Sequence, residues 1–60
     1  MNDIQRETKI KSQLKKLNYL LDKEYYVDFN TSVKEYIWYW ERIGDDYMVD
    51  YFNNSLPKFN

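Results

Sequence analysis

The residues best suited to molecular recognition lie together in the middle of the chain. Trp38, Tyr39 and Arg42 are of the three residue types most enriched at protein-binding hot spots. On a helix, Trp38 and Arg42 would share a face because they are four positions apart. Such side chains bind by ring burial, cation–π contact and hydrogen bonding. We predict a contact surface on these three residues, with Tyr19 as a further contact.

A second pattern is basic. Lys9, Lys16 and Lys23 recur every seven residues and would follow one side of a helix. Such a stripe can contact the phosphates of a nucleic acid. We favour the simpler interpretation that it is the solvated flank of an amphipathic helix. A helix-turn-helix is also disfavoured, because residues 46–54, in the place of a recognition helix, carry aspartates and no lysine or arginine.

Catalysis and metal binding have few candidate residues. The chain has no histidine, no cysteine and a single glycine. It therefore lacks the two residue types on which many general-base, nucleophile and zinc sites rely, and it cannot form a glycine-rich phosphate loop. The neighbouring carboxylates of Asp45 and Asp46 would not face each other on a helix, and helix capping explains them. We expect no catalytic residue, metal site or cofactor, and predict that the protein is not an enzyme.

The length and composition set further bounds. Sixty residues suffice for one small domain, predicted over residues 1–60. The net charge of −1 selects neither a polyanion nor a polycation as partner. No apolar run approaches the roughly 20 residues that cross a bilayer, and the N-terminus lacks the apolar stretch of a secretion signal. We expect no membrane association and a cytoplasmic location.

The first element to position these residues is a helix predicted over residues 3–24. Asn2 or Asp3 can cap it with a side-chain oxygen. Apolar residues at spacings of three and four define its core stripe: Ile10, Leu14, Leu17, Leu21 and Tyr25. The stripe could also pack against a second copy of itself, so we expect a monomer or a weak homodimer.

The second element is predicted over residues 32–43. Val27 and Phe29 alternate with polar residues, which indicates a short extended connection from Tyr26 to Thr31. Ser32 and Glu35 then have the spacing of a capping box. On this helix an apolar face would form opposite Trp38, with Trp40 at its centre. These apolar residues are Val33, Tyr36, Ile37, Trp40 and Ile43.

A strand is the alternative for residues 33–43, since tyrosine, isoleucine and tryptophan favour strands. Gly44 fits the left-handed position that ends many helices, and Asp45 or Asp46 can cap a third helix over residues 46–54. Residues 55–60 are predicted to form a frayed tail. The favoured fold is all-α, a helical hairpin in which two shorter helices cover the long first one. The alternative is α+β, with the first helix packed on a small antiparallel aromatic sheet.

These observations favour a protein-binding module. The chain has no alanine and is rich in residues with AT-rich codons. In coding bias, size and aromatic excess it resembles, as a class, the small accessory proteins of phages and mobile elements. That resemblance implies an inhibitor or modulator of a host or defence protein, acting in the host cytoplasm. One alternative is a dimeric nucleic-acid-associated regulator that uses the basic flank of the first helix. Another is a structural subunit of a larger assembly.

Overall fold

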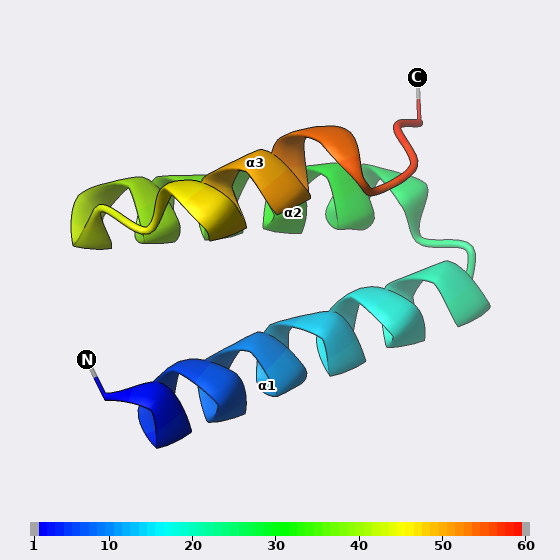
Figure 1. Ribbon diagram of the computed structural model, residues 1–60. Helices are drawn as coiled ribbons and strands as arrows, with labels where there is room; N and C mark the ends of the chain where they lie inside the picture. The colour runs from blue at the N-terminus through cyan, green and yellow to red at the C-terminus, as the bar shows by residue number, and fades with distance from the viewer. Residues whose placement is uncertain (1, 60) are drawn as a thin grey trace.

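Three helices form the described part of the chain, residues 2–59, in a computed structural model (Figure 1). They are α1 (Asp3–Asp22), α2 (Tyr26–Ile43) and α3 (Asp46–Asn54). Residues 2–59 contain no strand. The all-α prediction is confirmed, and the alternative with an aromatic sheet is wrong.

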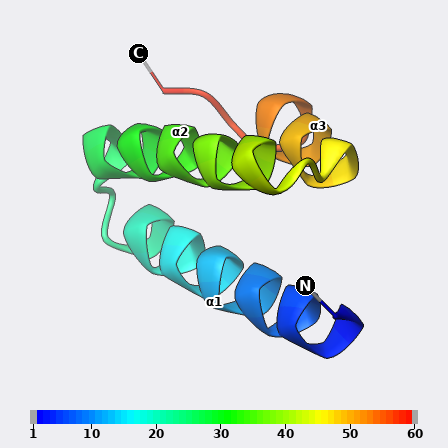
Figure 2. The ribbon, with the colours of Figure 1, turned by 90° about the vertical axis from the view of Figure 1, so that its left-hand side faces the viewer.

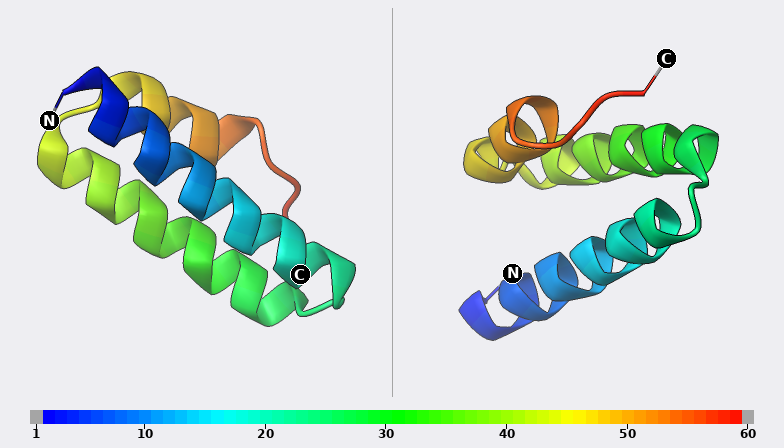
Figure 3. Two further views of the ribbon diagram at one scale, coloured as in Figure 1. Left: turned by 90° about the horizontal axis from the view of Figure 1, so that it is seen from below. Right: turned by 90° about the vertical axis from the view of Figure 1, so that its right-hand side faces the viewer.

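Helix α2 is the central element, because it packs against both α1 and α3. α1 and α2 form an antiparallel hairpin, closest at their connection and further apart toward the start of α1 (Figure 2). α3 runs back beside α2, and both lie on the same side of α1 in Figure 1 and in the right-hand view of Figure 3.

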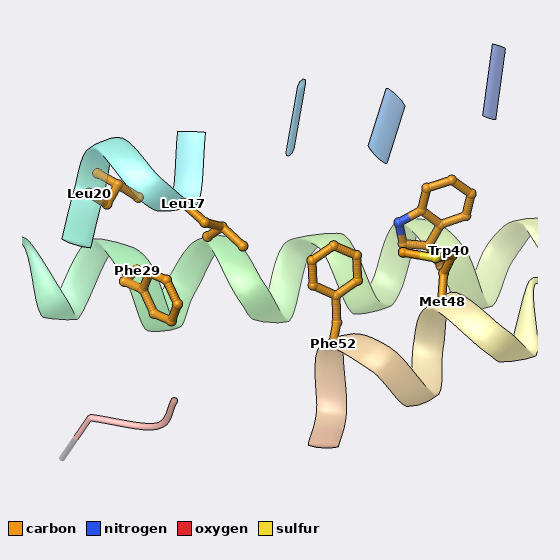
Figure 4. Close-up of a cluster of buried hydrophobic side chains, with 6 residues drawn as sticks. All are labelled: Leu17, Leu20, Phe29, Trp40, Met48 and Phe52. Atoms are coloured by element: carbon orange, nitrogen blue, oxygen red, sulfur yellow. The ribbon is translucent and has the colours of Figure 1, made fainter. Parts of the chain in front are cut away.

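All three helices contribute to one core (Figure 4). α1 supplies leucines, α2 supplies two large aromatic rings, and α3 supplies a methionine and a phenylalanine. The buried apolar side chains are Leu17, Leu20, Phe29, Trp40, Met48 and Phe52. Four of these six residues bear large rings or sulfur, so the core of this short chain depends on bulky side chains more than on their number.

Helix α1 begins where the sequence predicts, but it ends two residues earlier than predicted. The Asn2 side chain caps the helix, accepting a hydrogen bond from the Gln5 N–H at 2.8 Å. At the other end Glu24 adopts the left-handed conformation, with φ of 62°. The N–H of Glu24 then donates to Leu21 O, and that of Tyr25 to Leu20 O. This Schellman motif ends α1 at Asp22 and reverses the chain within three residues.

Helix α2 begins six residues earlier than predicted. The extended connection from Tyr26 to Thr31 is wrong, since these residues are helical. Phe29 explains the difference. It lies four residues before Val33 and so continues the apolar face of α2, and it is fully buried. The capping box is wrong as well, because Ser32 lies buried inside the helix.

The second turn matches its prediction. Gly44 has a φ of 83° and ends α2 in a second Schellman motif, with the Asp45 N–H donating to Trp40 O at 3.0 Å. The Asp45 side chain then caps α3 by accepting from the Met48 N–H. α3 ends at Asn54, shortly before Pro57, which disfavours helix in the residue that precedes it.

The predicted frayed tail is wrong for residues 55–59, and Asn60 lies outside the described residues. This 55–59 segment returns to α2. There the Phe59 ring stacks on Tyr26, with 4.3 Å between ring centroids. Phe59 also meets the Phe29 ring edge-on at 5.4 Å. An aromatic side chain that reaches two rings of α2 gives the segment a docking point that composition does not reveal.

Candidate interaction surface

Helix α2 separates its two tryptophans onto opposite faces. Trp40 points into the core and is 0% exposed, whereas Trp38 is 59% exposed. Residues two positions apart on a helix are about 200° apart around its axis, so one ring cannot follow the other inward. The outer face of α2 therefore presents a large aromatic ring to solvent.

Arg42 completes this outer surface. Its guanidinium carbon lies 4.8 Å from the centroid of the Trp38 ring, one helical turn further along α2. Both side chains are exposed. Stacking on the indole orders the long arginine side chain, and the planar guanidinium retains donors for a carboxylate or carbonyl. The predicted pairing of Trp38 with Arg42 is present in the structure.

Tyr39 faces a different direction. It is half-buried, its ring meets Trp40 edge-on at 5.0 Å, and the Lys9 ammonium lies 4.8 Å from its centroid. It thus lies at the border between α1 and α2. A shallow apolar groove there, about 400 Å³, is lined by Tyr39 and by α1 residues that include Ile4. The structure does not bring Tyr39 onto the face of Trp38 and Arg42.

Tyr19 belongs to another part of the molecule. It is exposed on α1, six residues beyond Gln13, the residue that contacts Trp40. Six helical residues span about 9 Å, so Tyr19 lies toward the hairpin connection. Exposed Tyr25 and Val27 lie at that end as well. The four candidate contact residues therefore lie in three separate places. Trp38 and Arg42 share one of them, and Tyr39 and Tyr19 each lie in another.

The basic stripe is exposed but partly engaged within the fold. Lys9, Lys16 and Lys23 are all exposed. Lys9 lies over Tyr39, and the Lys23 ammonium lies 5.9 Å from the Tyr19 ring. Two of the three lysines are thus placed against aromatic rings of the same chain. The choice between a solvated helix flank and a nucleic-acid contact stays a prediction.

Two polar contacts at the end of the hairpin away from its connection were missed by the sequence analysis. The Trp40 indole N–H donates to the side-chain oxygen of buried Gln13 at 2.8 Å. Arg6 forms an ion pair with Asp45, with its Nε 2.7 Å from Oδ2. The hydrogen bond from Arg6 lowers the pKa of the Asp45 carboxyl, assisted by the Met48 N–H and opposed by partial burial. Both contacts hold α1 to the far end of α2.

One further ionisable group is perturbed on the inner side of α2. Burial raises the pKa of the Tyr36 hydroxyl, and the charge of Glu35 adds to the effect. The Tyr36 ring packs near Phe52, with 5.8 Å between centroids. A tyrosine with a raised pKa stays protonated and uncharged at neutral pH, which suits its packing against the core.

Residues 2–59 contain no cluster of three or more acidic side chains that could hold a metal ion. Among the same residues, no helix has both the length and the apolar character needed to span a bilayer. No protein-family model, curated protein or solved structure matches the chain.

Proposed function

We propose that this protein is a non-catalytic binding module that docks on another protein through the outer face of α2. Trp38 is the anchor and Arg42 is its polar neighbour. The observation that carries the proposal is the exposure of Trp38 on a chain whose other tryptophan is fully buried. Exposed large rings are costly in small proteins and mark contact sites.

The size of the molecule supports one dominant surface. A standard interface takes about 800 Å² from each partner, and the whole described surface amounts to 4670 Å². A partner that covers about a sixth of it would occupy most of one helix face. The outer face of α2 offers a tryptophan–arginine pair near the end of the helix, and these two residue types are enriched in interface hot spots.

The biological role belongs to the same proposal. The coding bias and small size support an accessory protein of a phage or mobile element that modulates a host or defence protein in the cytoplasm. Docking of a helix face would suffice for such a role, since covering a partner's surface requires no chemistry. Tyr39 and Tyr19 lie off this face and are secondary contacts at most.

The test is capture of the partner from a cognate host lysate, followed by affinity measurement with purified components. Trp38→Ala should weaken binding by about 30-fold or more, equivalent to the hot-spot threshold of about 2 kcal/mol. Tyr47→Ala is the matched control, because it removes another exposed ring, 72% exposed, from α3. Equal affinities of the two variants would contradict the proposed surface.

Salt dependence separates this function from the nucleic-acid alternative. Binding through an aromatic helix face should change little between about 50 and 200 mM salt, the range in which phosphate contacts weaken steeply. A steep loss of affinity, together with sensitivity to substitution of Lys16, would favour the basic flank of α1 instead.

A further inference from the structure

A groove runs between α2 and α3, and it borders the outer face of α2, because Lys34, one helical turn before Trp38, lines it. Its apolar lining comes from Val33 and Ile37 of α2 and from Phe52 at its α3 wall. Residues 56–59 line it as well, and about 360 Å³ of space remains. The groove thus combines apolar and polar side chains and is only partly filled.

The 55–59 segment shows how this groove holds a chain. Pro57 keeps the segment out of helical conformation, and residues 57–59 carry no regular secondary structure. The side-chain amide of Asn30 contacts both polar groups of the Phe59 backbone. Its Nδ2 donates to the Phe59 carbonyl, and its Oδ1 accepts from the Phe59 N–H at 3.3 Å.

This two-point contact recognises backbone. A carboxamide that pairs with the N–H and C=O of one residue substitutes for a neighbouring strand, and it does so whatever side chain that residue carries. Selectivity comes instead from the ring site beside it. The Phe59 ring lies between Tyr26, stacked at 4.3 Å, and Phe29, edge-on at 5.4 Å. The site thus holds a non-helical segment of this chain by its backbone and by one aromatic side chain.

The segment is held by few contacts. Pro57 and Lys58 are exposed, and Phe59 itself is half-buried. Short segments with exposed backbone and little buried apolar area open at low free-energy cost compared with the core. The helices beneath share a core of Leu17, Leu20, Phe29, Trp40, Met48 and Phe52 that contains no residue of the segment, so the groove can persist when the segment leaves.

We propose that the α2–α3 groove is a peptide-binding site, and that a non-helical segment of a partner protein displaces residues 55–59 from it. The partner segment carries an aromatic residue that takes the place of Phe59 and is paired by Asn30. The proposal does not depend on the Trp38 surface, because neither Trp38 nor Arg42 lines the groove.

Charge adds a second element of selectivity. Lys34 lines the groove one helical turn beyond Asn30, and Lys58 lines it from the segment itself. When the segment leaves, Lys58 leaves with it and Lys34 stays. We expect the partner segment to carry an acidic residue directly before its aromatic residue, in the place of Lys58. Its carboxylate would then lie near Lys34, and this attraction favours binding at low salt.

The test uses the 60-residue chain and fluorescein-labelled peptides. The variant Phe59→Ala releases the segment, and circular dichroism should show that its helices persist. It should bind the peptide Ser-Leu-Pro-Lys-Phe-amide at least tenfold more tightly than the wild-type chain, measured by fluorescence anisotropy. Replacing Phe by Ala in the peptide should abolish binding. Replacing Lys by Glu should tighten binding at low salt, about 0.01 M, and lose that advantage near 1 M, where screening is nearly complete.

The double variant Asn30→Ala/Phe59→Ala is the matched control and should bind at least tenfold more weakly than Phe59→Ala alone. Equal binding by the two would show that the backbone is not recognised and would overturn the proposal. If Phe59→Ala does not fold, the wild-type chain is titrated with millimolar peptide and followed by NMR. The signals of the Asn30 side-chain amide and the Tyr26 ring should then shift, and their constancy would equally overturn it.

Discussion

Trp38 and Trp40 lie two residues apart on α2, but they differ in solvent exposure and in the groups that they contact. Trp40 is buried in the core beside Met48 (Figure 4), and its indole N–H has a partner in Gln13. Trp38 is more than half exposed, and its neighbour is the guanidinium of Arg42.

The comparison shows what each face of α2 can be used for. Burying a tryptophan ring stabilises the fold only if its N–H is also satisfied, and the inner face meets both conditions. On the outer face neither condition is met by the chain itself. The same residue type thus contributes to folding at one position and remains available for recognition at the other.

The largest effect is expected at the inner face. Trp40→Ala removes a fully buried ring and should destabilise the protein by about 3–5 kcal/mol. A domain of this length has a total stability of about 3–9 kcal/mol, so the variant should be largely unfolded at physiological temperature. Thermal melts followed by circular dichroism test this. A cooperative melt within a few degrees of wild type would show that the ring is not part of the core.

A smaller effect is expected from the polar partner of that ring. Gln13→Leu fills the same position with an apolar side chain but leaves the buried Trp40 N–H without its acceptor, which should cost about 1–3 kcal/mol. In a Trp40→Phe background the same substitution should cost much less, because no donor remains to be satisfied. Urea unfolding of the four chains gives this double-mutant cycle. Additive costs would mean that the hydrogen bond contributes nothing.

The ion pair at the same end of the hairpin should produce a pH-dependent effect. The pKa of Asp45 lies below its ordinary value of 3.8. The contribution of the Arg6–Asp45 ion pair to stability is therefore fully present above pH 3.8, and it is lost as the pH falls through the lower pKa of Asp45 in the folded state. Asp45→Asn keeps a side-chain oxygen for capping α3 but removes the charge.

This variant should melt below wild type at neutral pH, and the difference should narrow well below pH 3.8, where the carboxyl of wild type takes up its proton. Arg6→Gln, which removes the other partner, should show the same narrowing against wild type. Melting temperatures of the three proteins at neutral pH and at a pH well below 3.8 provide the measurement. A constant difference between Asp45→Asn and wild type would assign the effect to the cap instead of the ion pair.

The features that sequence analysis predicted correctly are local ones. Asn2, Gly44 and Asp45 end or begin helices through contacts within a few residues of themselves, so residue type at one position is enough. The separation of Trp38 from Trp40 follows from helical periodicity alone. The orientation of α2 around its axis is therefore encoded in the sequence pattern itself.

The features that were missed depend on contacts distant in sequence or on an uncommon backbone conformation. Gln13 is buried because Trp40, 27 residues away, needs an acceptor. Phe59 is ordered because α2 presents Asn30 and two rings, 29 residues or more before it. Glu24 takes a left-handed conformation that usually requires glycine. The first two features arise only when the helices have packed, and the third is a local turn that the residue type glutamate does not indicate.

The smallest effect on stability is expected at the outer face. Trp38→Ala removes a ring that contacts solvent and Arg42, and exposed substitutions of this kind usually change stability by less than about 0.5 kcal/mol. Its melting curve should thus coincide with that of wild type, while the fluorescence of the remaining Trp40 should keep the spectrum of a buried indole.

This result would sharpen the comparison, because two substitutions of one residue type, two positions apart, would differ by several kcal/mol. The measurement also guards the proposed function. A binding defect in Trp38→Ala can be assigned to the interface only when the fold is intact. If Trp38→Ala instead destabilised the protein as much as Trp40→Ala, both rings would be structural. That result would contradict the proposal that the outer face of α2 is a docking surface.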